Sequence, residues 1–147
     1  VASGKSLQWW DMTTNSKRRE WTVHQSEITG LAFSPKGRWL ASTSASEGIF
    51  LWEPDKDEPV KRLVKEGTKG FVHLAFHPNG KHLFSGTQTG DILVWELSSA
   101  KVIASFPPTH RILRAFHLSA NGQWLVSSAS DTTGHTLLTW WGCSLTP

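Results

Sequence analysis

One phrase returns along this chain at a nearly constant spacing. It reads Leu-Ala-Phe-Ser-Pro-Lys-Gly-Arg-Trp-Leu-Ala-Ser at 31–42 and Leu-Ala-Phe-His-Pro-Asn-Gly-Lys-His-Leu-Phe-Ser at 74–85, and a weaker copy occupies 116–127. The turn of each copy contains a glycine, namely Gly37, Gly80 and Gly122. A period of about 43 residues is typical of one supersecondary unit that is copied several times, so the fold is expected to be a repeat architecture.

The local pattern within each unit predicts strands. The apolar segments 28–34, 71–76 and 113–118 each end at a turn, and segments rich in Leu, Val, Ser and Thr return at 38–44, 81–86 and 123–128. Third segments at 49–53, 92–96 and 136–141 are dense in Ile, Leu, Phe and Trp, and fourth segments follow the first three units at 18–23, 59–64 and 101–106. The tryptophans that close the third segments are Trp10, Trp52, Trp95 and Trp140. Segments of this length suit strands and are too short for helices, which predicts an all-β chain of four-stranded antiparallel units.

These strands are apolar on both faces. In one of them Ile49 and Leu51 point one way, and Phe50 and Trp52 point the other way. A sheet of such strands must be covered on both sides, and sheets stacked around an axis cover one another. The pattern therefore favours a β-propeller built of short sheets.

The repeated phrase also resembles a known family. Ser34-Pro35-Lys36-Gly37 followed by Ile49-Phe50-Leu51-Trp52-Glu53 is similar to a WD40 repeat, as are the segment 92–96 and the dipeptide Trp10-Asp11. The resemblance implies a partial ring of three to three and a half blades, divided into a partial repeat at 1–23, repeats at 24–66 and 67–106, and a repeat lacking its outer strand at 107–147. We expect a segment of a larger propeller; association of several copies, or a second protein covering the ends, are the alternatives.

The family often joins a His, a Ser or Thr, an Asp and the Trp of each blade in a buried hydrogen-bond set. Only His24 matches the His, and Ser46 and Thr89 stand where the Asp is expected. The blades are therefore expected to depend more on apolar packing. Serines recur in the second strands at 42, 85 and 127, where hydrogen bonding within the blade is the expected role.

Motifs for catalysis are missing from the sequence. It contains no Gly-x-Ser-x-Gly elbow and no Walker spacing, and His73, His77 and His82 lack the spacing of a zinc site. We expect no enzyme activity, no cofactor and no metal. The single Cys143 favours a reducing compartment, and no run of 18 apolar residues predicts a membrane helix, so a cytoplasmic or nuclear protein is expected.

The resemblance implies a non-catalytic scaffold that binds other proteins within a larger assembly. Partners of such scaffolds dock on the loops that enter the first strands (24–27, 65–70 and 107–111) and on those between the second and third strands (45–48, 88–90 and 129–134). The candidate binding residues on these loops are His24, Glu27, Glu47, Lys65, Lys69, Gln88, His110, Arg111 and Asp131.

Basic residues suggest an alternative function. The net charge is +3, and cations cluster at 17–19 and at Lys61, Arg62, Lys65 and Lys69. Such clusters could bind nucleic acid or another anionic surface. They could equally be solvated side chains that protect the outer strands from edge-to-edge pairing.

Overall fold

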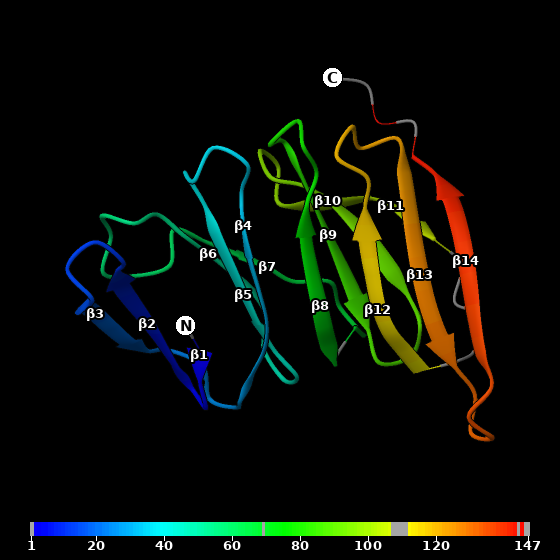
Figure 1. Cartoon of the computed structure of the whole chain (residues 1–147), viewed down its shortest axis with the longest axis horizontal. Helices are drawn as coiled ribbons and strands as arrows, with labels where there is room; N and C mark the ends of the chain where they lie inside the picture. The colour runs from blue at the N-terminus through cyan, green and yellow to red at the C-terminus, as the bar shows by residue number, and fades with distance from the viewer. Residues whose placement is uncertain (1, 69, 107–111, 144, 146–147) are drawn as a thin grey trace.

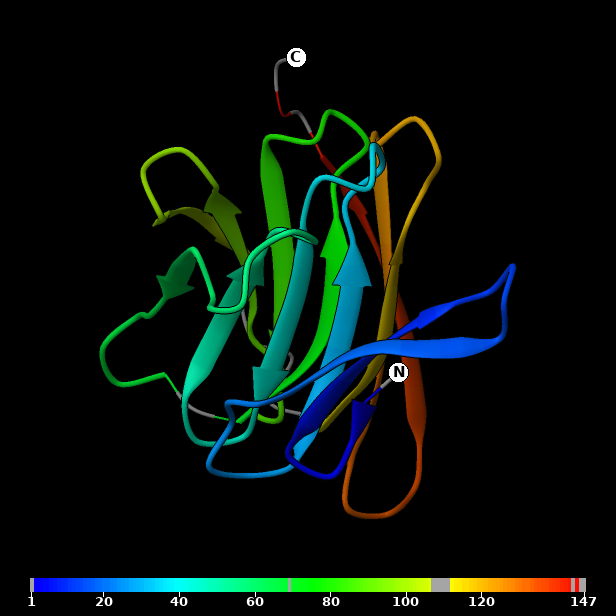
Figure 2. The same cartoon turned by 90° about the vertical axis from the view of Figure 1, so that its left-hand side faces the viewer.

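The computed structural model describes residues 2–68, 70–106, 112–143 and 145, and in this part of the chain all regular structure is β-strand. The strands form four antiparallel sheets that stand beside one another like the leaves of a fan (Figure 1). Figure 2, seen from the N-terminal sheet, shows the sheets lying one behind another. The prediction of an all-β fold made of propeller-type blades is confirmed.

Each sheet pairs strands in chain order, with three, four, four and three strands. The first sheet contains β1 (Ala2–Ser3), β2 (Ser6–Asp11) and β3 (Ser16–Thr22). The second contains β4 (Ile28–Phe33), β5 (Leu40–Ser44), β6 (Gly48–Trp52) and β7 (Lys61–Leu63). The third contains β8 (Phe71–Phe76), β9 (His82–Thr87), β10 (Ile92–Glu96) and β11 (Lys101–Phe106). The fourth contains β12 (Ile112–Leu118), β13 (Trp124–Ser130) and β14 (Thr136–Gly142).

The repeated turns have the conformation that their glycines allow. Gly37, Gly80 and Gly122 have φ angles of 67°, 68° and 73°, which side-chain-bearing residues adopt only with strain. In each turn the glycine N–H donates to the carbonyl three residues earlier, at 2.8 to 2.9 Å. These turns place the three β4–β5, β8–β9 and β12–β13 connections at one end of the fan, which we name the turn face (top of Figure 1).

Apolar clusters lie between successive sheets. Leu7 of the first sheet packs with Leu40 and Trp52 of the second. The opposite face of the second sheet contributes Ile49, Leu51 and Leu63 to a cluster with Phe71, Leu93 and Trp95 of the third. A third cluster joins Phe84, Ile92 and Val94 to Leu113, Phe116 and Leu125 of the last sheet. Strands β6 and β10 thus bury alternate residues on both faces, as their sequences predict, and this burial is the main apolar stabilisation of the stack.

Two of the four predicted closing tryptophans are fully enclosed. Trp52 is 2% exposed and Trp95 is 0% exposed. Trp10 is 40% exposed. It pairs with Lys17 of β3 on one side, but β1 on the other side pairs with β2 only at Ser6 and Leu7 and does not extend to Trp10. The indole N–H donates to Gln8 Oε1 at 3.2 Å.

The prediction for Trp140 is wrong by one residue. The β13–β14 register pairs Leu125 with Trp141 and Val126 with Trp140. Trp141 therefore takes the inward position that Trp52 and Trp95 take in their sheets, while Trp140 is 71% exposed on the opposite face of the sheet. Adjacent residues of a strand face opposite ways, so a shift of one position moves a side chain from the core to the surface.

Candidate protein-binding face

The end of the fan opposite the turn face is formed by the loops that enter the first strands and by those between the second and third strands; we name it the loop face. Hydrogen bonds within each blade support the loops of this face. The indole N–H of a third-strand tryptophan donates to a second-strand serine hydroxyl in three sheets: Trp52 to Ser42 at 2.9 Å, Trp95 to Ser85 at 2.8 Å, and Trp141 to Ser127 at 3.2 Å. The serines of the repeat thus bond within the blade, as the sequence predicts.

In the second sheet this contact extends to the loop face. His24 Nε2 lies 2.8 Å from Ser42 Oγ, and His24 Nδ1 lies 3.2 Å from Glu47 Oε2. One proton arrangement satisfies every group: the Trp52 indole donates to Ser42, Ser42 donates to His24 Nε2, and His24 Nδ1–H donates to Glu47. Burial lowers the pKa of His24, which keeps the ring neutral in this chain of hydrogen bonds.

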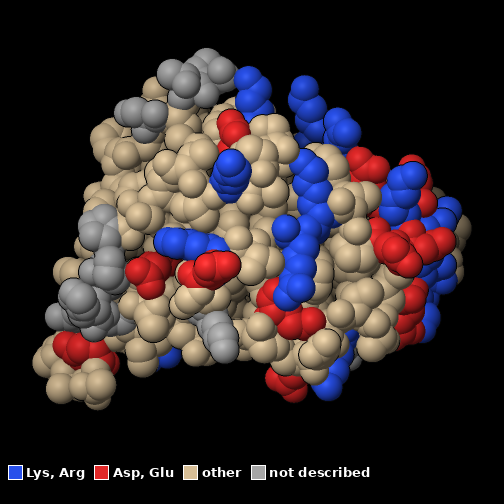
Figure 3. All heavy atoms as spheres, turned by 180° about the vertical axis from the view of Figure 1, so that it is seen from behind, with Lys and Arg blue, Asp and Glu red and all other residues tan. Residues whose placement is uncertain are grey.

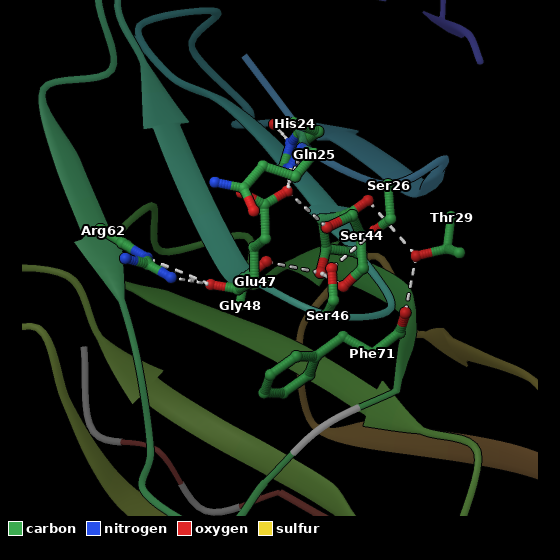
Figure 4. A network of polar contacts seen from close by, with 12 residues as sticks. His24, Gln25, Ser26, Thr29, Ser44, Ser46, Glu47, Gly48, Arg62 and Phe71 are labelled. Atoms are coloured by element: carbon green, nitrogen blue, oxygen red, sulfur yellow. Dashed lines mark hydrogen bonds and ion pairs between the residues drawn. The ribbon is translucent and has the colours of Figure 1, made fainter. Parts of the chain in front are cut away.

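Glu47 connects this network to the loop backbone (Figure 4). Its Oε2 also accepts from the Gln25 amide at 2.6 Å and from the Ser44 hydroxyl at 3.1 Å. Burial opposes ionisation of Glu47, but these bonds and the one from His24 outweigh it and lower the pKa of the carboxyl group. The expectation that the buried set lacks its carboxylate is therefore corrected in this blade, because Glu47 supplies it one residue beyond Ser46.

Backbone hydrogen bonds join the loops of neighbouring sheets. The Gly70 N–H donates to the Ala45 carbonyl at 2.8 Å, and the Gln88 N–H donates to the Gly70 carbonyl at 2.8 Å. The Arg62 guanidinium donates twice to the Glu47 carbonyl, at 2.8 and 3.1 Å (Figure 4). These bonds fix three successive loops relative to one another, so the face is a rigid surface.

The predicted binding residues divide into four groups. His24 is 3% exposed and Glu47 is largely enclosed, and their side chains hold the loops together. Glu27, Lys65 and Gln88 have exposed side chains on three different loops of the face.

Of the remaining predicted residues, the structure describes Asp131. Asp131 is half-buried, and its Oδ1 accepts from the Thr133 and His135 amides at 3.0 Å each, which shapes the β13–β14 loop. Lys69, His110 and Arg111 lie outside the described residues.

The basic clusters are largely engaged within the molecule. Lys17 pairs with Glu20, Arg18 with Asp11, and Arg19 with Asp57. Lys61 donates to the carbonyls of Leu97 and Ser98 at 2.7 and 3.0 Å, and Arg62 is held by Glu47 as described. Figure 3, seen from behind the fan, shows Lys and Arg side chains of this face with Asp and Glu side chains among them.

The three neighbouring histidines have packing partners. His73 lies against Phe116, with ring centroids 6.2 Å apart, and His77 stacks on Phe84. His77 Nε2 also lies 3.1 Å from the Gly122 carbonyl, while His82 bonds to Asn79. Among the described residues no three His, Cys, Asp or Glu side chains are grouped as metal ligands would be. That part of the chain also has no helix of the length and hydrophobicity needed to cross a membrane.

Comparison with known proteins agrees with this architecture. The sequence model of the family described as "WD domain, G-beta repeat" matches residues 15–53 and 58–96, which together are more than half of the chain. The probable cytosolic iron-sulfur protein assembly protein 1 of Sclerotinia sclerotiorum is 51% identical over 35 residues, which is 24% of this chain and 8% of that protein. The human WD repeat-containing protein 36 is 42% identical over 43 residues, which is 29% of this chain and 5% of that protein.

The matches to these curated relatives thus extend over less than a tenth of their length, and they lie within proteins whose names describe assembly or WD repeats. The two matched segments contain all four strands of the second sheet and strands β8, β9 and β10 of the third, which carry the two enclosed tryptophan–serine pairs. On the repeats, the closing strands and the stacked sheets together, the chain belongs to the WD40 repeat family.

Proposed function

We propose that this chain is a non-catalytic scaffold whose loop face binds other proteins within a multiprotein assembly. Membership of the WD40 family supports a role in protein–protein interaction. The observation that carries the proposal is the backbone connection from Ala45 through Gly70 to Gln88, which holds three loops in one arrangement while Glu27 and Lys65 stay exposed. A rigid scaffold that presents side chains from its loops loses little conformational entropy on binding.

The location and partners follow from the same proposal. The printed name of the fungal relative describes a cytosolic assembly protein, which supports a cytoplasmic scaffold in an assembly of several subunits. Binding of nucleic acid through the Lys/Arg clusters has less support, because Lys17, Arg18 and Arg19 are each paired with a carboxylate. Those pairs would have to be broken before the cations could neutralise phosphates.

The experiment is affinity purification of tagged protein from the source cells, followed by quantitative mass spectrometry. The test variant is the double charge swap Glu27→Lys with Lys65→Glu, which alters the loop face and leaves the net charge unchanged. The control is Lys17→Glu with Glu20→Lys, which reverses an ion pair on β3 and preserves it. The proposal predicts proteins that are lost with the loop-face swap and retained with the control. Recovery of the same proteins with all three forms would contradict it.

A further inference from the structure

A groove on the turn face lies between the second and third sheets. Its larger part is a cavity of about 550 Å³ whose lining includes Trp39, Lys61, Lys81, His82 and Glu96. A smaller cavity of about 210 Å³, lined in part by Ser34, Lys36, Arg38 and Asn79, adjoins it, because Trp39 and Gly80 line both. The two cavities therefore form one groove, which we name the turn-face groove, on the side of the molecule away from the loop face.

The walls of the groove are held in place by contacts between the sheets. Lys61 of β7 donates to the carbonyls of Leu97 and Ser98 in the next blade, and these three residues line the larger cavity. In the smaller cavity, the Arg38 guanidinium lies over the Trp39 ring, 5.0 Å from its centroid. Trp39 is half-buried and lines both cavities, so the groove has lysines in its larger part and Lys36 and Arg38 in its smaller part.

His82 supplies a buried donor in this groove. The Asn79 Oδ1 accepts from the Lys81 N–H at 2.9 Å, which orients the amide so that its Nδ2 donates to His82 Nδ1 at 3.0 Å. The proton of the neutral ring is therefore on Nε2. His82 is 8% exposed, and no hydrogen bond engages its Nε2 anywhere in residues 2–68, 70–106, 112–143 and 145. An acceptor brought into the groove can therefore accept from this N–H without breaking a hydrogen bond between described residues.

The charges around the groove favour an anionic ligand with separated charges. Arg38 is 3.6 Å from Glu53, whereas neither Lys36 nor Lys81 forms an ion pair with any described residue. Glu96 also lines the groove, and the hydrogen bond from Ser99 lowers the pKa of this carboxyl group, so the groove contains one fixed negative charge.

We propose that the turn-face groove binds an extended acidic peptide segment of a partner protein, with an apolar side chain on Trp39 and acidic side chains on both sides of it. One carboxylate accepts from His82 Nε2–H and pairs with Lys81, and the other pairs with Lys36 and Arg38. A peptide fits better than nucleic acid, because a phosphate at every nucleotide would bring negative charge against Glu96. A peptide carries its charges only at chosen positions, and its backbone N–H groups can donate to Glu96.

The turn-face groove is a second surface, distinct from the loop face, so peptide binding there can be tested separately from the proposed function. The probe is the fluorescein-labelled peptide Gly-Glu-Glu-Phe-Glu-Glu-Gly, and the readout is fluorescence anisotropy. Its controls are the same peptide with each Glu replaced by Gln, and a labelled twelve-nucleotide oligothymidine. The test variants are Lys81→Glu and Arg38→Glu, both on exposed side chains, and the matched control is Lys65→Glu on the loop face.

The inference predicts saturable binding of the acidic peptide, weakened about tenfold by each test variant and changed less than about twofold by Lys65→Glu. Equal losses of affinity with all three variants would overturn it, because binding would then depend only on the net charge of the protein. Equal binding of the Gln peptide, or no binding of the acidic peptide, would also overturn it. Preferred binding of oligothymidine would reassign the groove to nucleic acid. None of these outcomes changes the result of the loop-face swap, so failure of this groove and failure of the proposed function are distinguishable.

Discussion

The Ser42 hydroxyl is the part of the blade whose removal should be most informative. It is completely buried, and it bonds both the Trp52 indole and the His24 ring, at 2.9 and 2.8 Å. Ser85 occupies the same position in the next blade, but among the described residues its hydroxyl bonds only the Trp95 indole, at 2.8 Å. The two serines therefore differ in how many buried groups depend on them.

Substituting each serine by alanine gives a matched comparison. Every buried polar group left without a partner costs about 1–3 kcal/mol. Ser85→Ala leaves one such group, so its cost is expected near the middle of that range. Ser42→Ala leaves two and also releases the ring that connects to Glu47, so its cost is expected to be greater by about 1–2 kcal/mol.

The free energies of unfolding should be measured by urea denaturation at pH 7.5, with the slope of each transition compared to confirm that the variants unfold in the same way. A Ser42→Ala cost equal to or smaller than that of Ser85→Ala would refute the reasoning, since it would mean that the His24 contact contributes nothing to the fold.

Two other predictions concern stability. Burial lowers the pKa of His24 and His82, so below pH ~6.5 the unfolded chain binds more protons than the folded chain. The free energy of unfolding should therefore fall as the pH is lowered from about 7.5 to about 5.5. Urea titrations at both pH values check this, and a stability that stays constant or rises would contradict it. An added Cβ at Gly122 would lie 2.2 Å from His77 Nε2, whereas one at Gly37 meets nothing within 4 Å. Gly122→Ala should therefore lower the melting temperature clearly more than Gly37→Ala. Equal shifts in melting temperature would exclude the contact of Gly122 with His77 between the third and fourth blades.

The sequence alone was sufficient to predict the strands and their stacking, because a repeated apolar pattern identifies both the period and the two buried faces. The sequence does not show which of two adjacent tryptophans faces the core. Trp140 and Trp141 fit the repeat almost equally well, and the β13–β14 pairing, which places Trp141 opposite Leu125, decides between them. Local sequence does not contain that pairing.

The loops were less predictable than the strands. The family pattern places an Asp at the position of Ser46, but a glutamate has a longer side chain, and Glu47 reaches His24 from the next position. Either acid within one residue of Ser46 can therefore supply the carboxylate. Whether a loop residue such as Lys65 or His24 is exposed depends on contacts between loops, which only the folded arrangement shows.

The sheets of this fold pack face to face, and one contact between the third and fourth sheets tests that stacking directly. An added Cβ at Gly86 of β9 would lie 2.2 Å from Leu113 Cδ2 of β12, so the glycine backbone and the leucine methyl of neighbouring blades are in contact. In an isotope-edited NMR spectrum, nuclear Overhauser effects are expected between the Gly86 α-protons and both the Leu113 methyl groups and the Phe116 ring. Gly86 α-protons that show effects only to residues of their own sheet would contradict the stacking of the blades.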